Sequence, residues 1–263
     1  MQIKGMADLT DMQWEQVKPL VEWNQTRRLD GRGRPWRNAR QVLDGVLWIL
    51  RTGAPWQDLP SRYGPYQTCH RRFQQWQREG VLDGILWGVV RRSASARRLG
   101  TGGDIYRCLL RGGKKGGDRV GPTLCGKGSK IVAIGNRAGL PLAVRVTSAS
   151  PHEATLVEET LAQRHTADLP QRMIGDRAYD SDPLDERLQR QYQVQLIAPN
   201  RCNKRRRTQD GRPLRRYRRR WKIERLFAWL KNFRRLTNRW ERHALNFLGM
   251  VQLGCMLILL RHL

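Results

Sequence analysis

Four residues with chemically useful side chains share one basic stretch near the carboxyl end of the chain: Tyr217, Arg220, Glu224 and Lys231. Their spacings of three, four and seven residues predict one shared face of an α-helix, at about 100° per residue. The apolar residues of the stretch fall on the neighbouring face, so Glu224 is predicted at the rim of the core. A carboxylate held there between cations could bind a metal ion beside an anion. A solvated charged helix with one tyrosine is the alternative.

Read as Y-x2-R-x3-E-x6-K, the stretch resembles the last signature of the DDE transposases of bacterial insertion sequences. The likeness continues through Lys114–Gly117, Gly126–Gly128, Ser148–Glu153, Ile174–Asp180 and Arg234–Leu236. The resemblance implies that Asp176 and Glu224 are the second and third acids of a catalytic triad, where they would ligate Mg²⁺ or Mn²⁺ in a two-ion site. It also implies that Tyr217, Arg220 and Lys231 bind the DNA end.

The activity implied by this resemblance is cut-and-paste DNA transposition by metal-dependent phosphoryl transfer, first to water and then from the freed 3′ hydroxyl to target DNA. Two divalent ions about 4 Å apart can activate the attacking oxygen and stabilise the leaving oxygen. The implied partners are double-stranded DNA, at terminal inverted repeats and at the target, and a second copy of the chain in a homodimer. The alternative is a catalytically inactive DNA-binding protein on the terminal repeats. A metal-dependent nuclease that acts in DNA repair or on RNA is disfavoured, because the face formed by Tyr217, Arg220 and Lys231 fits the binding of DNA ends.

Asp176 is also singled out by its position in the sequence. It ends the apolar run Met173–Gly175 and is therefore predicted at the carboxyl end of a strand, where ligands bind in open α/β sheets. Asp180 and Asp182 follow closely, ahead of Pro183, and we interpret both as helix caps.

The family pattern breaks at Arg107. In relatives the first catalytic aspartate stands seven residues before the first lysine of Lys-Lys-Gly-Gly, and here that position is Arg107. The sequence around Arg107, residues 101–113, does not have the pattern of a buried strand. Residues 91–113 are therefore expected to be an irregular linker or a disrupted first catalytic strand. Codons for Asp104–Leu110, read one nucleotide later, can encode Phe-Ile-Asp-Ala-Ser-Phe, which suggests compensating frameshifts. Weak or absent catalysis is the expected result.

The composition favours a nucleic-acid partner. Of 263 residues, 50 are Lys or Arg and 23 are Asp or Glu, which gives a net charge of +27. Eleven Lys or Arg and one acid lie within residues 201–220, so DNA affinity should depend steeply on salt. No secretory pattern is seen, and the apolar run 247–260 is shorter than the roughly 20 residues of a membrane span. Five cysteines without a C-x2-C pair fit a reducing compartment. We therefore expect a bacterial cytoplasmic protein associated with the nucleoid, with no membrane partner.

Residues 9–90 are predicted to form a small all-α, helix-turn-helix-like DNA-binding domain. Thr10 and Gln13 form a capping box for the first helix, and later helices are expected at about 40–52 and 67–78. In the last of these, Phe73 and Trp76 are predicted to face inward and Arg71, Arg72 and Arg78 to face DNA. A plain helical bundle is the alternative.

Residues 114–263 are predicted to form the second domain, an α/β unit. Strands are expected at 129–134 and 141–147 around a turn at 136–139, then a helix at 153–164, a strand at 172–175, a helix opened by Pro183 and a strand at 195–198. This order implies a mixed sheet with flanking helices. The resemblance implies that the domain is ribonuclease H-like and catalytic.

Overall fold

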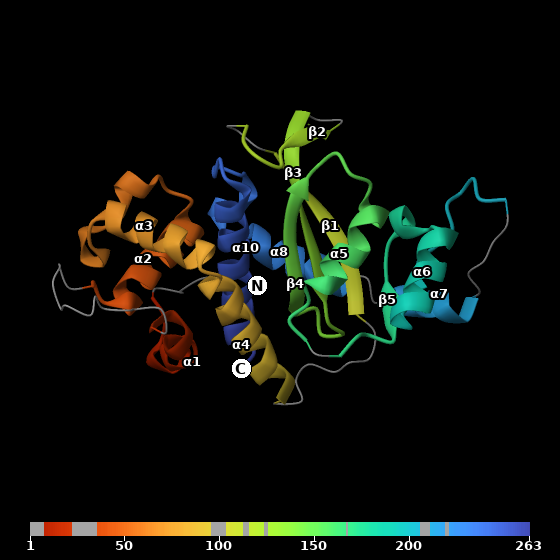
Figure 1. The fold of residues 1–263 in the computed structure, drawn as a ribbon, viewed down its shortest axis with the longest axis horizontal. Helices are drawn as coiled ribbons and strands as arrows, with labels where there is room; N and C mark the ends of the chain where they lie inside the picture. Colours follow the sequence, from red (N-terminus) through yellow and green to blue (C-terminus); the bar gives the residue numbers. More distant parts are fainter. Residues whose placement is uncertain are drawn as a thin grey trace.

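The computed structural model describes residues 8–22, 36–95, 104–112, 116–123, 126–166, 168–205, 211–218 and 221–263. Of residues 94, 95, 104–112 and 211–213, only the backbone is described. The described parts form a mixed α/β ribonuclease H-like fold preceded by a small all-α region, as the sequence predicted (Figure 1).

The chain begins with helices α1 (Asp11–Glu22), α2 (Ala39–Thr52), α3 (Tyr66–Arg78) and α4 (Val81–Ser95). The predicted capping box is present, because Thr10 and Gln13 each accept a hydrogen bond from the other's backbone N–H at 3.2 Å. Gly53 ends α2 with a left-handed φ of 69° and donates its N–H to the Ile49 carbonyl. The turns η1 (Trp56–Asp58) and η2 (Ser61–Tyr63) connect α2 to α3.

The sheet contains β1 (Asp104–Gly112), β2 (Gly121–Thr123), β3 (Gly126–Gly135), β4 (Pro141–Ser148), β5 (Arg172–Ile174) and β6 (Gln195–Ile197). Its order is β2-β3-β1-β5-β6, with β4 also paired to β3. Strand β1 is antiparallel to β3 and parallel to β5. The β3–β4 turn forms where it was predicted, with the Asn136 side chain accepting the N–H groups of Ala138 and Leu140.

The expectation of an irregular linker or disrupted strand at 91–113 is wrong for much of that range. Helix α4 continues to Ser95, and residues 104–112 form β1 in the interior of the sheet. Eight residues of β1, from Ile105 to Gly112, are paired with β3. A segment with weak local strand signals is thus held by partners on both sides.

The remaining helices surround the sheet. They are η3 (Glu153–Leu156), α5 (Val157–Ala162), η4 (Arg177–Tyr179), α6 (Asp182–Tyr192), α7 (Gly211–Tyr217), α8 (Trp221–Lys231), α9 (Arg234–Thr237) and α10 (Ala244–Leu260). Helix α5 contacts β3 and β4, whereas α8 contacts β1 and β3.

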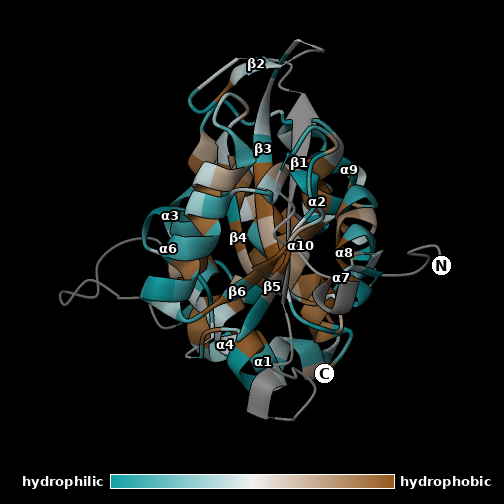
Figure 2. Ribbon diagram, turned by 90° about the vertical axis from the view of Figure 1, so that its right-hand side faces the viewer, coloured by the Kyte–Doolittle hydropathy of each residue, from teal (hydrophilic) through white to brown (hydrophobic). Residues whose placement is uncertain are grey.

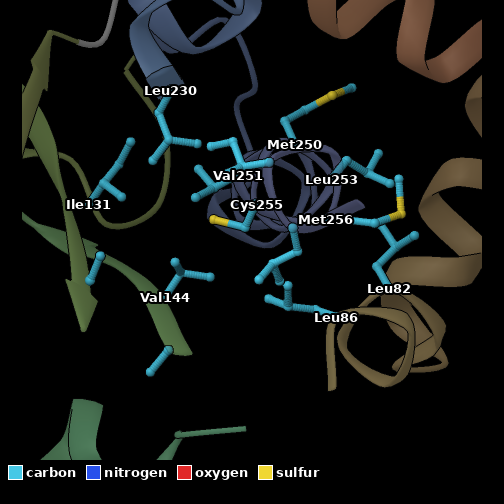
Figure 3. Packing of buried hydrophobic residues seen from close by; sticks show 14 of the residues in the cluster. Leu82, Leu86, Ile131, Val144, Leu230, Met250, Val251, Leu253, Cys255 and Met256 are labelled. Atoms are coloured by element: carbon cyan, nitrogen blue, oxygen red, sulfur yellow. The ribbon is translucent and has the colours of Figure 1, made fainter. Parts of the chain in front are cut away.

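Helix α10 joins the two parts of the fold. In Figure 1 it lies between α2 and α3 on one side and the sheet on the other, and it contacts α2, α3, α4 and β4. Every residue from Gly249 to Leu260 is buried, and the helix is strongly apolar in Figure 2. Figure 3 shows Met256 directed toward Leu82 and Leu86 of α4, and Val251 and Cys255 directed toward Ile131 and Val144 of the sheet. The all-α region and the sheet therefore share one hydrophobic core. In the described part of the chain no helix is long and apolar enough to cross a membrane.

Candidate functional site

Asp176 stands directly beyond the carboxyl end of β5, as predicted. Its Oδ1 accepts the backbone N–H of Ala178 at 2.8 Å and so caps η4. A Cβ at Gly175 would lie 2.7 Å from Cδ2 of Tyr179, so the preceding glycine allows the Tyr179 ring to pack against the strand end. The Tyr179 hydroxyl donates to Glu153 at 2.9 Å. These contacts fix the turn that presents the Asp176 carboxylate.

Glu224 lies half-buried in the first turn of α8, at the rim of the core as predicted. The amino end of α8 is tied to the β3–β4 turn, because Lys222 donates to the Arg137 carbonyl at 2.8 Å and Arg225 donates to the Ala138 carbonyl. Gly139 has a φ of +80°, and a Cβ there would lie 2.6 Å from the Lys222 carbonyl oxygen. The sheet thus determines where α8 places its carboxylate.

The two acids belong to the same end of the sheet. Gly135, Ile105 and Ile174 are level with one another across β3, β1 and β5. The Ile223 side chain, next to Glu224, lies over Gly135, since a Cβ there would be 2.8 Å from its Cδ1. Asp176 follows Ile174 by two residues.

The same register gives the position of Arg107. Ile105 pairs with Ile174 of the parallel strand β5, and Arg107 and Asp176 each follow this pair by two residues in sequence. Arg107 itself pairs with Ala133 of β3. The strand proposed as disrupted is present, and an arginine occupies its position beside the Asp176 turn. Two other acids, Asp104 and Asp118, lie near Arg107 in sequence. The Asp104 backbone pairs with Met173 of β5, and Asp118 accepts the Ala244 N–H at the start of α10.

Asp176 and Tyr217 line a common cleft of about 580 Å³, together with Arg177, Ala178, Pro199 and Leu214. Glu224 is not among the described residues that line it. Tyr217 is the last residue of α7, and α8 begins at Trp221. Residues 219 and 220 lie outside the described residues, so the expectation of one helix carrying Tyr217 through Lys231 stays a prediction. Glu224 and Lys231 share α8, where Lys231 is exposed. Arg220 lies outside the described residues.

Asp180 has a different role from the helix cap that we predicted. Its Oδ1 accepts Lys204 Nζ at 2.8 Å, and its Oδ2 accepts the Arg201 N–H at 2.6 Å. Lys204 also donates to Asp182 at 2.6 Å. Burial lowers the pKa of Lys204, but the bonds to both aspartates outweigh it and raise the pKa above its ordinary value. Sequence patterns gave no signal for these contacts, because the partners lie more than 20 residues apart.

The arginines of α3 divide into two groups. Arg71 and Arg78 are exposed, whereas Arg72 is only 6% exposed and stacks 3.9 Å from the centre of the Trp36 ring. The prediction that Arg72 faces outward is therefore wrong. Burial lowers the pKa of the Arg72 guanidinium. Phe73 and Trp76 are buried, as expected.

The carboxylates fit a complete metal site poorly. Among the side chains that the structure describes, no three His, Cys, Asp or Glu residues are placed to hold one ion. Asp176 and Glu224 remain as two hard oxygen donors at one end of the sheet, and arginine stands at position 107, where the family resemblance led us to expect the first catalytic aspartate.

Comparisons with known families cover both parts of the chain. A family described as "Putative transposase of IS4/5 family" matches residues 9–86. A family described as "Transposase DDE domain" matches residues 93–260.

Two bacterial proteins are similar to parts of this chain in sequence. Over 99 residues the chain is 37% identical to the uncharacterized protein y4sN of Sinorhizobium fredii, covering 38% of this chain and 75% of that protein. Over 139 residues it is 36% identical to the "Putative transposase for insertion sequence element IS402" of Burkholderia cepacia, covering 50% of this chain and 62% of that protein.

One solved structure has a similar fold. The piggyBac transposase, in a synaptic complex with hairpin DNA, superposes with a TM-score of 0.54 at 14% identity. The match covers 94% of this chain and 72% of the piggyBac chain.

Proposed function

The chain belongs to the IS4/5 family of DDE transposases, and we propose that it binds the terminal inverted repeats of an insertion sequence and brings them to target DNA. Residues 9–90 would supply DNA binding and residues 114–263 the catalytic fold. The relatives are bacterial, which supports the proposal that the protein acts in the cytoplasm, at the nucleoid. Transposition joins two ends to one target, so a homodimer is the expected assembly.

The observation that carries this proposal is the geometry around Asp176. Its carboxylate stands at the carboxyl end of β5, beside β1, in a cleft that it shares with Tyr217. Leu214 and Tyr217, two described residues of the basic run 201–220, also line this cleft. A carboxylate beside a basic, aromatic wall suits a DNA backbone better than a small neutral substrate.

Two surfaces are proposed to hold DNA. Tyr217, Arg220 and Lys231 would bind the element's end near the cleft. Arg71 and Arg78, both exposed on α3, would contact the more internal part of the repeat. The buried Arg72 supports the shape of this surface by stacking on Trp36.

Asp176 and Glu224 are proposed as the ligands of Mg²⁺ or Mn²⁺. Hard divalent ions prefer such oxygen donors. A two-ion site would normally use a third carboxylate, and arginine at position 107 supplies a positive charge instead. We therefore expect end binding to be retained and DNA cleavage to be slow.

Footprinting with the purified chain tests the proposal. The probe is a duplex from the end of the DNA element that encodes the chain, and a shuffled duplex of equal composition is the comparison. We expect protection of the terminal repeat and at least tenfold tighter binding to the end duplex. Lys231→Ala and Arg78→Ala should each weaken that binding. Equal affinity for both duplexes would refute the proposed function.

A further inference from the structure

Asp180 is a buried carboxylate next to the Asp176 turn. Its side chain is 2% exposed, and both oxygens have partners from the same short segment, Arg201–Lys204. One partner is the Lys204 ammonium and the other is the Arg201 backbone N–H. A buried carboxylate whose two oxygens both accept hydrogen bonds holds the donor groups in one arrangement.

Arg201 adds a second connection between the same two segments. Its Nε donates to the Arg177 carbonyl at 3.3 Å, and its Nη2 donates to the Ala178 carbonyl at 3.2 Å. We call these contacts, together with those of Asp180 to Lys204 and to the Arg201 N–H, the latch. It ties residues 201–204 to the turn that Asp176 caps.

The latch lies at the wall of the cleft. Arg177 and Ala178, whose carbonyls accept from Arg201, line the cleft, and so does Pro199, two residues before Arg201. Residues 201–204 are also the first part of the basic run that leads to α7 and Tyr217. Two walls of the cleft are therefore joined through Asp180.

We propose that Asp180 is a positioning residue, which through the latch holds residues 201–204, the start of the basic run, at a fixed place relative to the Asp176 turn. Resting on the proposed function, this inference assigns the preference for DNA ends to the latch. A loose segment would keep its positive charge and bind any duplex. A latched segment keeps one position at the wall of the cleft, and we expect a DNA end beside Asp176 to fit that position.

Asp180→Asn separates this idea from simple electrostatics. The change removes a negative charge from a DNA-binding surface, so electrostatics alone would tighten binding to every duplex. Loss of the latch instead weakens binding to the end duplex and leaves binding to a shuffled duplex unchanged or tighter.

Glu241→Gln is a matched control. Glu241 is also a buried, ion-paired carboxylate, with Arg235 Nε at 2.6 Å and side-chain exposures of 6% and 9%. The substitution makes the same change of charge and type, but its partner Arg235 bonds to the Ala54 carbonyl after α2, and neither residue lines the cleft. It therefore reports the effect of a broken buried ion pair without loss of the latch.

The experiment measures affinities of the full chain for the end duplex and for the shuffled duplex, well below each variant's melting temperature. Asp180→Asn should reduce the ratio of the two affinities at least tenfold, whereas Glu241→Gln should leave the ratio within twofold of wild type. The double variant Asp180→Asn/Lys204→Met removes both charges of the buried pair without a change of net charge, and it should behave like Asp180→Asn. It also removes the Lys204 contact to Asp182, whose side chain is 49% exposed and stays hydrated. The double variant covers the case in which the single variant does not fold.

Hydrogen exchange of the DNA-free chain provides a second readout. Amides of residues 199–204, including the Arg201 N–H, should exchange at least tenfold faster in Asp180→Asn and at the wild-type rate in Glu241→Gln. An unchanged affinity ratio in Asp180→Asn, or an equal loss in Glu241→Gln, would overturn the inference. A wild-type chain without preference for the end duplex, but with exchange that responds to Asp180→Asn, would instead refute the proposed function and leave the latch as a structural feature only.

Discussion

Replacing Arg107 by aspartate should restore metal-dependent DNA cleavage. Positions 107 and 176 each lie two residues beyond the paired Ile105 and Ile174 of neighbouring parallel strands, and neighbouring strands lie about 4.8 Å apart. The Arg107→Asp variant would thus place a second carboxylate beside Asp176, at the position where relatives carry their first catalytic aspartate.

The expected gain can be bounded from this distance. With an effective dielectric constant of about 20, a unit charge about 5 Å from a divalent ion changes the ion's energy by roughly 7 kcal/mol, and the substitution reverses the sign of that charge. The reach of an arginine side chain and screening by solvent remove most of this difference. If about 3 kcal/mol remains, cleavage should become on the order of 100-fold faster.

The assay is single-turnover cleavage of an end-labelled duplex in Mg²⁺ and, separately, in Mn²⁺. Arg107→Ala is the control, because it removes the positive charge without adding a ligand, and it should recover only a small part of the rate. Asp176→Asn in the Arg107→Asp background should abolish the gain. The reasoning is refuted if the wild-type chain already cleaves as fast as Arg107→Asp, or if Arg107→Asp is no faster than Arg107→Ala.

Three further predictions concern charge and stability. Affinity for the end duplex should fall by roughly 10³ to 10⁵ between 50 and 200 mM salt if about 6 to 10 phosphates are contacted; a slope near zero in a salt titration would contradict the proposed surface. Burial lowers the pKa of His70 and of His165 below the ordinary 6.5, so the unfolded chain binds these protons more readily and the free energy of unfolding should decrease as pH falls through 6.5. Urea denaturation at pH 7 and pH 5.5 measures this, and replacing both histidines by asparagine should flatten the dependence. Arg239→Met should lower the free energy of unfolding by about 1 to 3 kcal/mol, because Arg239 is 1% exposed and donates to Ser129 Oγ and to the carbonyls of Glu241 and Arg242, which would lose their partner; a loss below about 0.5 kcal/mol would contradict a structural role for this network.

Most elements of the fold could be predicted from signals between residues close in sequence. The Thr10 capping box, Gly53 at the end of α2 and the Asn136 turn all depend on contacts within a few residues. The apolar run before Asp176 placed that residue at the end of β5. In each case the side chain and the backbone that it stabilises are close in sequence.

The features that sequence reasoning missed depend on distant partners. Strand β1 is held by pairing with β3 and β5 rather than by its own composition. Arg72 is buried because Trp36, 36 residues earlier, covers it. Asp180 contacts Lys204 rather than a helix end.

The position of α10 in the sequence has a consequence for folding during synthesis. The helix that completes the hydrophobic core for both α4 and the sheet is made of residues 244–260, so neither part can complete its core before these residues have been synthesised. A copy of the gene with a stop codon before residue 244 would yield chains that lack α10 and therefore part of the shared hydrophobic core. Cellular proteases should degrade such chains. Truncated products are then poor inhibitors of the intact protein, and damaged copies that still influence their relatives should be those with substitutions or balanced frameshifts.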